Sequence, residues 1–279
     1  MIATNVHGKN HHKVGGIGKY VISLKILDNK NRLILCSRKK NSKLFKYTIG
    51  GMGLTGVIYS LKIKLKKIYS ELIYEEKIKC HNLKETLSNI NKSKNWEYNV
   101  SWIDTSPSNN SIGRSIVSRG YFYKKNKKSN FEYSTKEIFT VPNIFLFSLM
   151  NRYIIQILNT LYFNFSRLGK NLTSINDFFY PLDKIKNWNY VYGKKGFISY
   201  QCSVPVNNAY ESIHEILITL KRYKAYSFIS VLKSMKKKDF PLSFGQNGFT
   251  LVFDFPNYKD ISMILNKVND IVSKYNGKI

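Results

Sequence analysis

The order of strand and helix patterns after residue 70 constrains the fold of this chain more than any other feature. Runs of strand length and amphipathic runs of helix length follow one another as strand, helix, strand, strand, and later as strand, helix, strand, strand, helix. This order favours an antiparallel sheet covered by helices. We therefore predict an α+β fold, with these elements at 72–80, 83–90, 96–102, 112–121, 197–206, 209–223, 226–233, 249–255 and 258–275.

One stretch of this region does not follow that pattern. The apolar run 144–165 is interrupted by polar residues such as Asn151 and Arg152, so it falls short of the ~20 apolar residues that span a bilayer. We expect it to form a buried helix pair or a lid, with a segment lying on a membrane as the alternative. Residues 172–188, which include Pro181, are predicted to be rich in loops.

Residues 1–70 are predicted to form a separate, strand-rich domain. The runs 20–27 and 32–36 flank a polar turn, which indicates a hairpin, and a short helix is expected at 42–47. A strand at 57–65 alternates apolar and polar side chains, so one of its faces should be buried and the other exposed.

Glycines gather at two places in this first domain, Gly15-Gly16 with Gly18, and the loop from Gly50 to Gly56. Glycine adopts positive φ without strain and lets a backbone approach a ligand closely. Peptide N–H groups in such loops can bind a phosphate or the carbonyl group of a flavin.

The chain carries 45 Lys and Arg against 17 Asp and Glu, a net charge of +28. This excess suggests a polyanionic partner, either nucleic acid or an anionic membrane surface. The lysines are scattered and no nucleic-acid-binding motif is present, so we attribute most of the excess to compositional drift and expect no nucleic acid partner. The three cysteines have no close pair, which is typical of a reducing compartment.

Short motifs along the whole chain resemble those of the decaprenylphosphoryl-ribose oxidase family, flavin enzymes of the vanillyl-alcohol-oxidase superfamily. In order, they are His7-Gly8-Lys9-Asn10-His11-His12, Gly50-Gly51-Met52-Gly53-Leu54-Thr55-Gly56, Val117-Ser118-Arg119-Gly120, Phe179-Tyr180-Pro181-Leu182-Asp183, Trp188-Asn189, Gln201, Pro241-Leu242-Ser243-Phe244 and Asp254-Phe255-Pro256.

The resemblance implies a domain organisation. Residues 1–70 correspond to the second half of a PCMH-type FAD-binding domain. Residues 71–279 correspond to a substrate domain, with a lid or membrane-proximal segment at about 141–180. The family's chains extend further at both ends, so the resemblance implies an internal piece that lacks a glycine-rich pyrophosphate loop and a C-terminal strand with a lysine.

The same resemblance implies site residues. Non-covalently bound FAD would lie along a first set: Thr4, Asn5, Val6, His7, Gly53 and Ile58. Catalysis would involve a second set: His7, Lys9, Gln201, Lys233 and Asp254. A third set would line the substrate pocket: Trp102, Phe179, Ser199, Met235, Thr250 and Val252. Ser199 and Phe179 depart from the family's residues, which leaves the sugar and the lipid open. Val252 stands where mycobacterial members carry a cysteine that covalent inhibitors attack, so the resemblance implies that this chain lacks that reactivity, whereas turnover need not suffer.

Strand periodicity independently groups five of these residues. Side chains two apart on a strand share one face, so Ser199 lies with Gln201, and Thr250 with Asp254. If helices cover the apolar faces, these four side chains and Lys233 can meet on the opposite face. That face would suit a polar, phosphate-bearing ligand; the alternative is an ordinary solvated sheet surface.

The resemblance implies an FAD-dependent oxidoreductase that oxidises the 2-hydroxyl of a polyprenyl-phosphoryl ribose, with a short-chain NAD(P)H-dependent reductase as its partner and contact with a membrane surface. We expect a bacterial protein, cytoplasmic or peripheral at the membrane, with no signal peptide and no transmembrane helix. The rival hypotheses are an aldonolactone or alditol oxidase of the same superfamily, and a non-catalytic basic fragment that binds polyanions. His7, His11 and His12 do not have the spacing of a zinc site, so we expect no metal.

Overall fold

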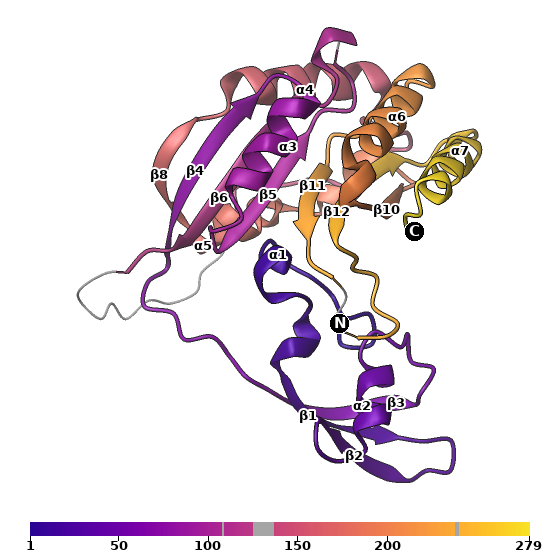
Figure 1. The fold of residues 1–279 in the computed structure, drawn as a ribbon. Coiled ribbons are helices and arrows are strands. Elements are labelled where there is room, and N and C mark those ends of the chain that lie inside the picture. The colour runs from indigo at the N-terminus through magenta and orange to yellow at the C-terminus, as the bar shows by residue number, and fades with distance from the viewer. Residues whose placement is uncertain (108, 125–136, 238–239) are drawn as a thin grey trace. The chain divides into compact units, whose positions relative to one another are not determined.

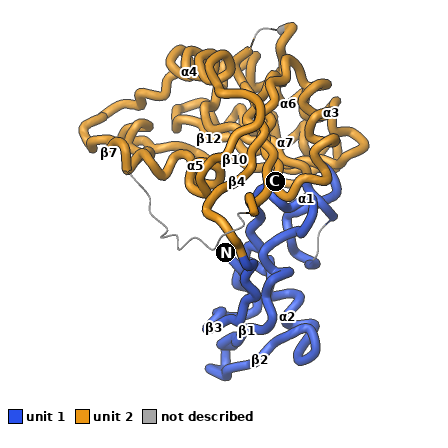
Figure 2. Tube along the Cα trace, turned by 90° about the vertical axis from the view of Figure 1, so that its left-hand side faces the viewer, with its two compact units in different colours: residues 1–67, 235–248 blue, residues 68–234, 249–279 orange. Residues whose placement is uncertain are grey.

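A computed structural model describes residues 1–107, 109–124, 137–237 and 240–279 (Figure 1). The chain forms two compact units (Figure 2). Unit 1 comprises residues 1–67 and 235–248, and unit 2 comprises residues 68–234 and 249–279. The first boundary lies near the predicted one, but 235–248 packs with unit 1, whereas the sequence analysis assigned it to the second domain.

Unit 1 is built on a small antiparallel sheet in the order β2-β1-β3. β1 (Val21–Leu27) and β2 (Leu33–Ser37) form the predicted hairpin, which pairs Leu24 with Cys36 and Ile26 with Ile34. α2 (Ser42–Thr48) follows, and β3 (Val57–Ile63) completes the sheet. One face of the sheet is buried in a core that includes Phe45, Ile49 and Phe240. The N-terminal segment adds the short helices α1 (His11–Val14) and η1 (Ile17–Tyr20).

The expectation that one face of β3 is buried is wrong for most of the strand. Val57 and Tyr59 are each 67% exposed and Leu61 is 43% exposed, although alternation assigned them to the buried face. The pairing of β3 with β1 is irregular between Lys25 and Ile26, which shifts the register of the alternating side chains. Ile58, which alternation assigned to the opposite face, packs against the core of the unit instead.

Unit 2 contains a seven-stranded sheet in the order β10-β12-β11-β5-β6-β4-β8. The strand pairs from β11 to β8 are antiparallel, as the predicted α+β fold requires. The bounds are β4 (Leu72–Cys80), β5 (Tyr98–Ile103), β6 (Ser115–Phe122), β8 (Gly169–Ser174), β10 (Phe197–Pro205), β11 (Ser230–Met235) and β12 (Gly248–Pro256). A separate parallel pair joins β7 (Phe139–Thr140) and β9 (Ile185–Lys186).

Three helices cover one face of this sheet: α3 (Leu83–Lys92), α6 (Ala209–Arg222) and α7 (Ile261–Lys274) (Figure 1). Asn82 starts α3 by accepting a hydrogen bond from the Glu85 N–H, and Glu85 accepts one from the His81 N–H in return. The apolar stripes of α6 and α7 meet the inward-facing side chains of β10 and β12, including Cys202, Leu251 and Phe253. This helix-covered face holds the main core of the unit.

The apolar run 144–165 does not form a buried helix pair, one of the structures expected for it. It contains a single long helix, α4 (Arg152–Phe165), not a buried pair, and most of the apolar side chains of α4 are exposed. Residues 169–174 form β8, which pairs with β4 from Leu72 to Lys77. The helix α5 (Ile175–Phe179) and the short 3-10 turns η3 (Pro181–Lys184) and η4 (Trp188–Tyr192) replace much of the expected loop.

Candidate functional site

In unit 1, Asn5 fixes the N-terminal segment to two distant parts of the chain. Its side chain donates to the Ser243 hydroxyl oxygen at 2.8 Å and accepts from the Gly18 N–H at 2.9 Å. Asn5 is buried and has φ +44°, a left-handed conformation that asparagine tolerates better than most residues. The amide group therefore organises the segment, and any contact of Asn5 with a ligand would come from its backbone.

Two predicted cofactor-binding segments lie side by side in unit 1. The Gly50 N–H donates to the Ile2 carbonyl at 3.1 Å, and the Met52 N–H donates to the Ala3 carbonyl at 2.8 Å. These bonds hold the glycine loop against the segment that contains Thr4 and Val6, two exposed residues. The structure thus brings together residues that are about fifty positions apart.

Gly53 is the open point of this loop. Its φ is +85°, and a Cβ atom built on it would meet nothing within 4 Å. Its N–H has no hydrogen-bond partner in the described part of the chain. A planar ligand could therefore approach this backbone closely. Ile58, in contrast, points into the core of unit 1 and is half-buried.

His7 and Lys9 follow in the same segment, and His7 belongs to an aromatic group. Its ring contacts that of His11 edge-on, with ring centroids 5.6 Å apart, and stacks on Phe244 at 6.3 Å. The Nδ1 atom of His11 accepts the Lys236 N–H at 3.1 Å. Met235, expected in a pocket wall near Trp102, is buried in unit 1, where its Cε lies 3.3 Å from a Cβ built on Gly245. Sequence reasoning assigned no site role to Ser243 and Phe244, although both lie in a motif that carried the family resemblance.

In unit 2, the face opposite to α3, α6 and α7 has the predicted polar side chains. Gln201 on β10 donates from Nε2 to the Thr250 hydroxyl oxygen on β12 at 3.1 Å, and that hydroxyl donates to the Cys202 carbonyl at 2.9 Å. We call Ser199, Gln201, Lys233, Thr250 and Asp254 the polar face. They come from the three neighbouring strands β10, β12 and β11.

Lys233 is the cation of the polar face. Burial lowers its pKa from the ordinary 10.5 to about 8. No carboxylate or hydrogen-bond acceptor in the described residues pairs with its ammonium group. A cation that has lost part of its hydration without gaining a partner is ready to bind an anion.

Asp254 lies on the same face and is partly enclosed. Burial raises the pKa of its carboxyl group, and a hydrogen bond from Ser199 offsets part of that rise. Tyr192, which no sequence pattern identified, is also close, because the charge of Asp254 adds to burial in raising the pKa of the Tyr192 hydroxyl. Asp254 therefore holds its proton more tightly than an exposed carboxylate does.

The other predicted pocket residues have different surroundings. Trp102 donates its indole N–H to the Phe228 carbonyl and packs against Tyr162 of α4, with ring centroids 4.8 Å apart. Phe179 belongs to a separate aromatic cluster with Tyr98 and Phe178, each 4.9 Å from it. Val252 is half-buried between Thr250 and Asp254 on β12.

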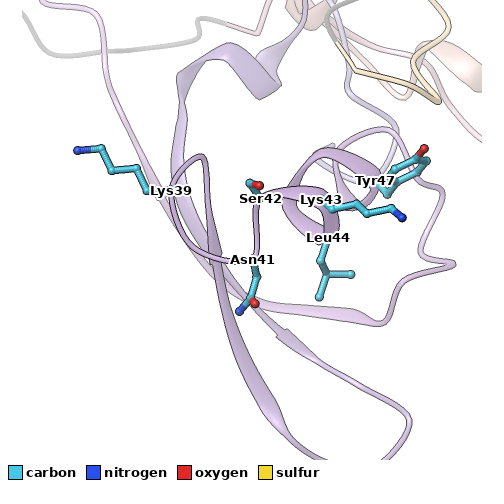
Figure 3. Close-up of a pocket in the computed structure, with 6 residues that line it drawn as sticks. All are labelled: Lys39, Asn41, Ser42, Lys43, Leu44 and Tyr47. Atoms are coloured by element: carbon cyan, nitrogen blue, oxygen red, sulfur yellow. The ribbon is translucent and has the colours of Figure 1, made fainter.

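Figure 3 shows a surface hollow at the start of α2 in unit 1, lined by Lys39, Asn41, Ser42, Lys43, Leu44 and Tyr47. The seven-residue helix behind it is too short to add an appreciable dipole. This hollow contains none of the predicted site residues.

The predicted site therefore falls into two sets. Unit 1 holds Thr4, Asn5, Val6, His7, Lys9, Gly53, Ile58 and Met235. Unit 2 holds Trp102, Phe179, Ser199, Gln201, Lys233, Thr250, Val252 and Asp254. The first set includes an open glycine loop beside the N-terminal segment, and the second includes a sheet face with a partly buried lysine.

The two sets thus lie in a unit with a glycine loop and in an α+β unit with a polar sheet face. No established family model matches the chain. The chain is 28% identical to decaprenylphosphoryl-beta-D-ribose oxidase of Mycolicibacterium smegmatis over an alignment that covers 100% of this chain and 63% of that protein. A shorter match, 28% identical over 105 residues, covers 38% of the chain and 17% of D-arabinono-1,4-lactone oxidase of Debaryomyces hansenii.

These matches confirm the resemblance stated from the motifs. The whole of this chain aligns with the decaprenylphosphoryl-beta-D-ribose oxidase, but it spans only about 63% of that protein's length. None of the described helices is long and apolar enough to cross a membrane.

Proposed function

We propose that this chain supplies the substrate-binding part and one flavin-contacting part of an FAD-dependent oxidoreductase that oxidises the 2-hydroxyl group of a polyprenyl-phosphoryl ribose. The observation that carries the proposal is Lys233, a partly buried cation without a partner among the described residues, on one sheet face with Gln201, Thr250 and Asp254. The similarity to a decaprenylphosphoryl-ribose oxidase over the whole chain supports the same substrate class.

The residues of unit 1 fit a bound flavin. Gly53 leaves open space where a planar ring could lie, its N–H has no hydrogen-bond partner among the described residues, and the segment with Thr4 and Val6 runs beside it. His7 and Lys9 would border the ring. FAD, held without a covalent bond, would accept the hydride from the carbinol carbon of the sugar.

The residues of unit 2 would bind and orient the sugar phosphate. Lys233 would bind the phosphate as an ammonium ion, and the anion would offset the desolvation that now lowers its pKa. Gln201 would donate to sugar hydroxyls, and Asp254, with its raised pKa, would accept a hydroxyl proton. The 2-keto product would then be reduced by a separate short-chain NAD(P)H-dependent reductase, and the lipid would keep the reaction at a membrane surface.

Titration of the purified chain with FAD tests the cofactor part of the proposal. We expect a bound-flavin absorbance spectrum and quenched flavin fluorescence. Gly53→Val should weaken FAD binding by at least tenfold, because its side chain fills the approach to the loop. Gly169→Val is a matched control, since Gly169 also has positive φ, +82°, and open space at Cβ, but lies on β8 of unit 2. A chain that stays colourless, or a Gly53→Val variant that binds FAD as well as the control, would contradict the proposal.

A soluble lactone or alditol is the second candidate substrate, favoured by the shorter match to D-arabinono-1,4-lactone oxidase. Of the two candidate substrates, only the polyprenyl-phosphoryl ribose carries a phosphate group. Dye-coupled turnover of the flavin-loaded protein with a polyprenyl-phosphoryl ribose should be lost in Lys233→Met, whereas turnover of a neutral lactone should not depend on the cation.

A further inference from the structure

The solvent-facing side of α4 carries a stripe of large apolar side chains and, after Arg152 at its first position, no charge. Tyr153, Ile157, Leu161 and Phe165 follow one another at four-residue intervals and are 62, 58, 47 and 80% exposed. No Lys, Arg, Asp or Glu occurs between Arg152 and Arg167. Side chains four apart lie on the same side of a helix, so these four form one stripe, which we call the α4 stripe.

The other long helices of unit 2 do not share this property. The exposed side of α7 carries Lys267, Asp270 and Lys274, as is usual for a helix in contact with water. The opposite side of α4 is anchored in the unit, because Asn159 donates to the buried carboxylate of Asp104 at 2.8 Å. The α4 stripe therefore faces away from the core of the unit.

Cations lie at both ends of α4. Arg152, Lys195 and Lys224 line a cavity next to its N-terminal end, with several tyrosines and a single carboxylate, Asp260. Arg167 and Lys170 follow its C-terminal end and are exposed. Just before α4, Ile144 and Phe147 are 71 and 82% exposed.

We propose that α4 is a docking surface for an anionic lipid bilayer. The stripe lies among the lipid chains near the headgroups, and the flanking cations bind lipid phosphates. Charge complementarity favours this occupant over a second copy of the chain, since two copies, each with a net charge of +28, would repel one another, and the cations at both ends of α4 would meet cations. The inference deepens the proposed function, because a lipid-linked sugar would be met at this surface.

Flotation of the 279-residue chain with lipid vesicles tests this inference without flavin or substrate, so its outcome is independent of the FAD titration. We expect binding to phosphatidylcholine vesicles that contain about 30% phosphatidylglycerol, and at least tenfold weaker binding to pure phosphatidylcholine. The double variant I157E/L161E should bind the anionic vesicles at least tenfold less tightly, because two carboxylates would enter the lipid boundary. Met263→Glu is the matched control: Met263 is 49% exposed on α7, and its replacement should leave vesicle binding unchanged.

Several results would overturn the inference. The unaltered chain could fail to bind anionic vesicles, or I157E/L161E could bind them as tightly as Met263→Glu does. A dimer that dissociates only in I157E/L161E, seen by analytical ultracentrifugation in the absence of lipid, would assign the α4 stripe to a second copy.

A folding control accompanies these measurements. Unchanged tryptophan fluorescence of the double variant would exclude misfolding as the cause of lost binding.

Discussion

Replacing Lys233 by Met should make unit 2 more stable and at the same time remove the proposed phosphate site. The pKa of Lys233 falls from 10.5 to about 8 through burial alone, and each unit of pKa corresponds to ~1.4 kcal/mol, so the unpaired ammonium group costs about 3 kcal/mol. Water that reaches the partly exposed group lowers this cost. We expect Lys233→Met to raise the free energy of unfolding at pH 7 by about 2 to 3 kcal/mol.

The pH dependence of this stability difference shows whether the buried charge of Lys233 is its cause. The unfolded chain holds the lysine proton more tightly than the folded one, so the destabilisation is complete below pH 8 and fades as the pH rises from about 8 towards 10.5. Most of the difference between Lys233→Met and the unaltered chain should therefore have disappeared at pH 10. An apolar side chain whose only effect was better packing would give a difference that does not change with pH.

Urea unfolding followed by tryptophan fluorescence measures this quantity for unit 2 alone, since Trp96, Trp102 and Trp188 are the only tryptophans and all lie there. Lys170→Met, an exposed lysine on β8 of the same unit, is the control and should change stability by less than about 0.5 kcal/mol. If Lys233→Met is no more stable than this control at pH 7, the reasoning from an unpaired buried cation is wrong.

Four further predictions concern single groups. Affinity for a phosphate-bearing sugar should fall as the pH rises through about 8, because Lys233 loses its charge; calorimetric titration should show this in the unaltered chain and not in Lys233→Met. Asp254→Asn should stabilise unit 2 at pH 7 and lose that gain as the pH falls below the raised pKa, because only the ionised carboxylate is penalised by burial. Asn5→Ala leaves the Gly18 N–H and the Ser243 hydroxyl without their partner, at about 1 to 3 kcal/mol, and should speed hydrogen exchange at 240–247 but not in β10 and β12. Asn159→Leu should destabilise unit 2 by about 1 to 3 kcal/mol in the same urea assay, since a donor to the buried Asp104 carboxylate is lost.

Local patterns in the sequence were enough to predict most of the strands and helices. The hairpin of β1 and β2, and the elements β4, α3, β10, α6, β12 and α7, lie within a few residues of their predicted positions. Each of them has a period of 2 or 3.6 in its own residues, and this period decides which side chains can be buried together. The same period placed Gln201 and Thr250 on one face, which the hydrogen bond between them confirms.

Contacts between distant residues decided the rest. β8 has no apolar alternation and is a strand because β4 offers it an unpaired edge. Residues 235–248 join unit 1 because Ser243 bonds to Asn5, 238 positions earlier.

The electrostatic character of the site also comes from tertiary structure alone. Lys233 is one of many lysines in the sequence, and only its enclosure at the polar face lowers its pKa. In the same way, the apolar run at 144–165 left a buried helix pair, a lid and a segment on a membrane open, and only the packing of α4 through Asn159 shows that its stripe is left exposed to solvent. Periodicity states which side chains lie together, but burial depends on what the rest of the chain places over them.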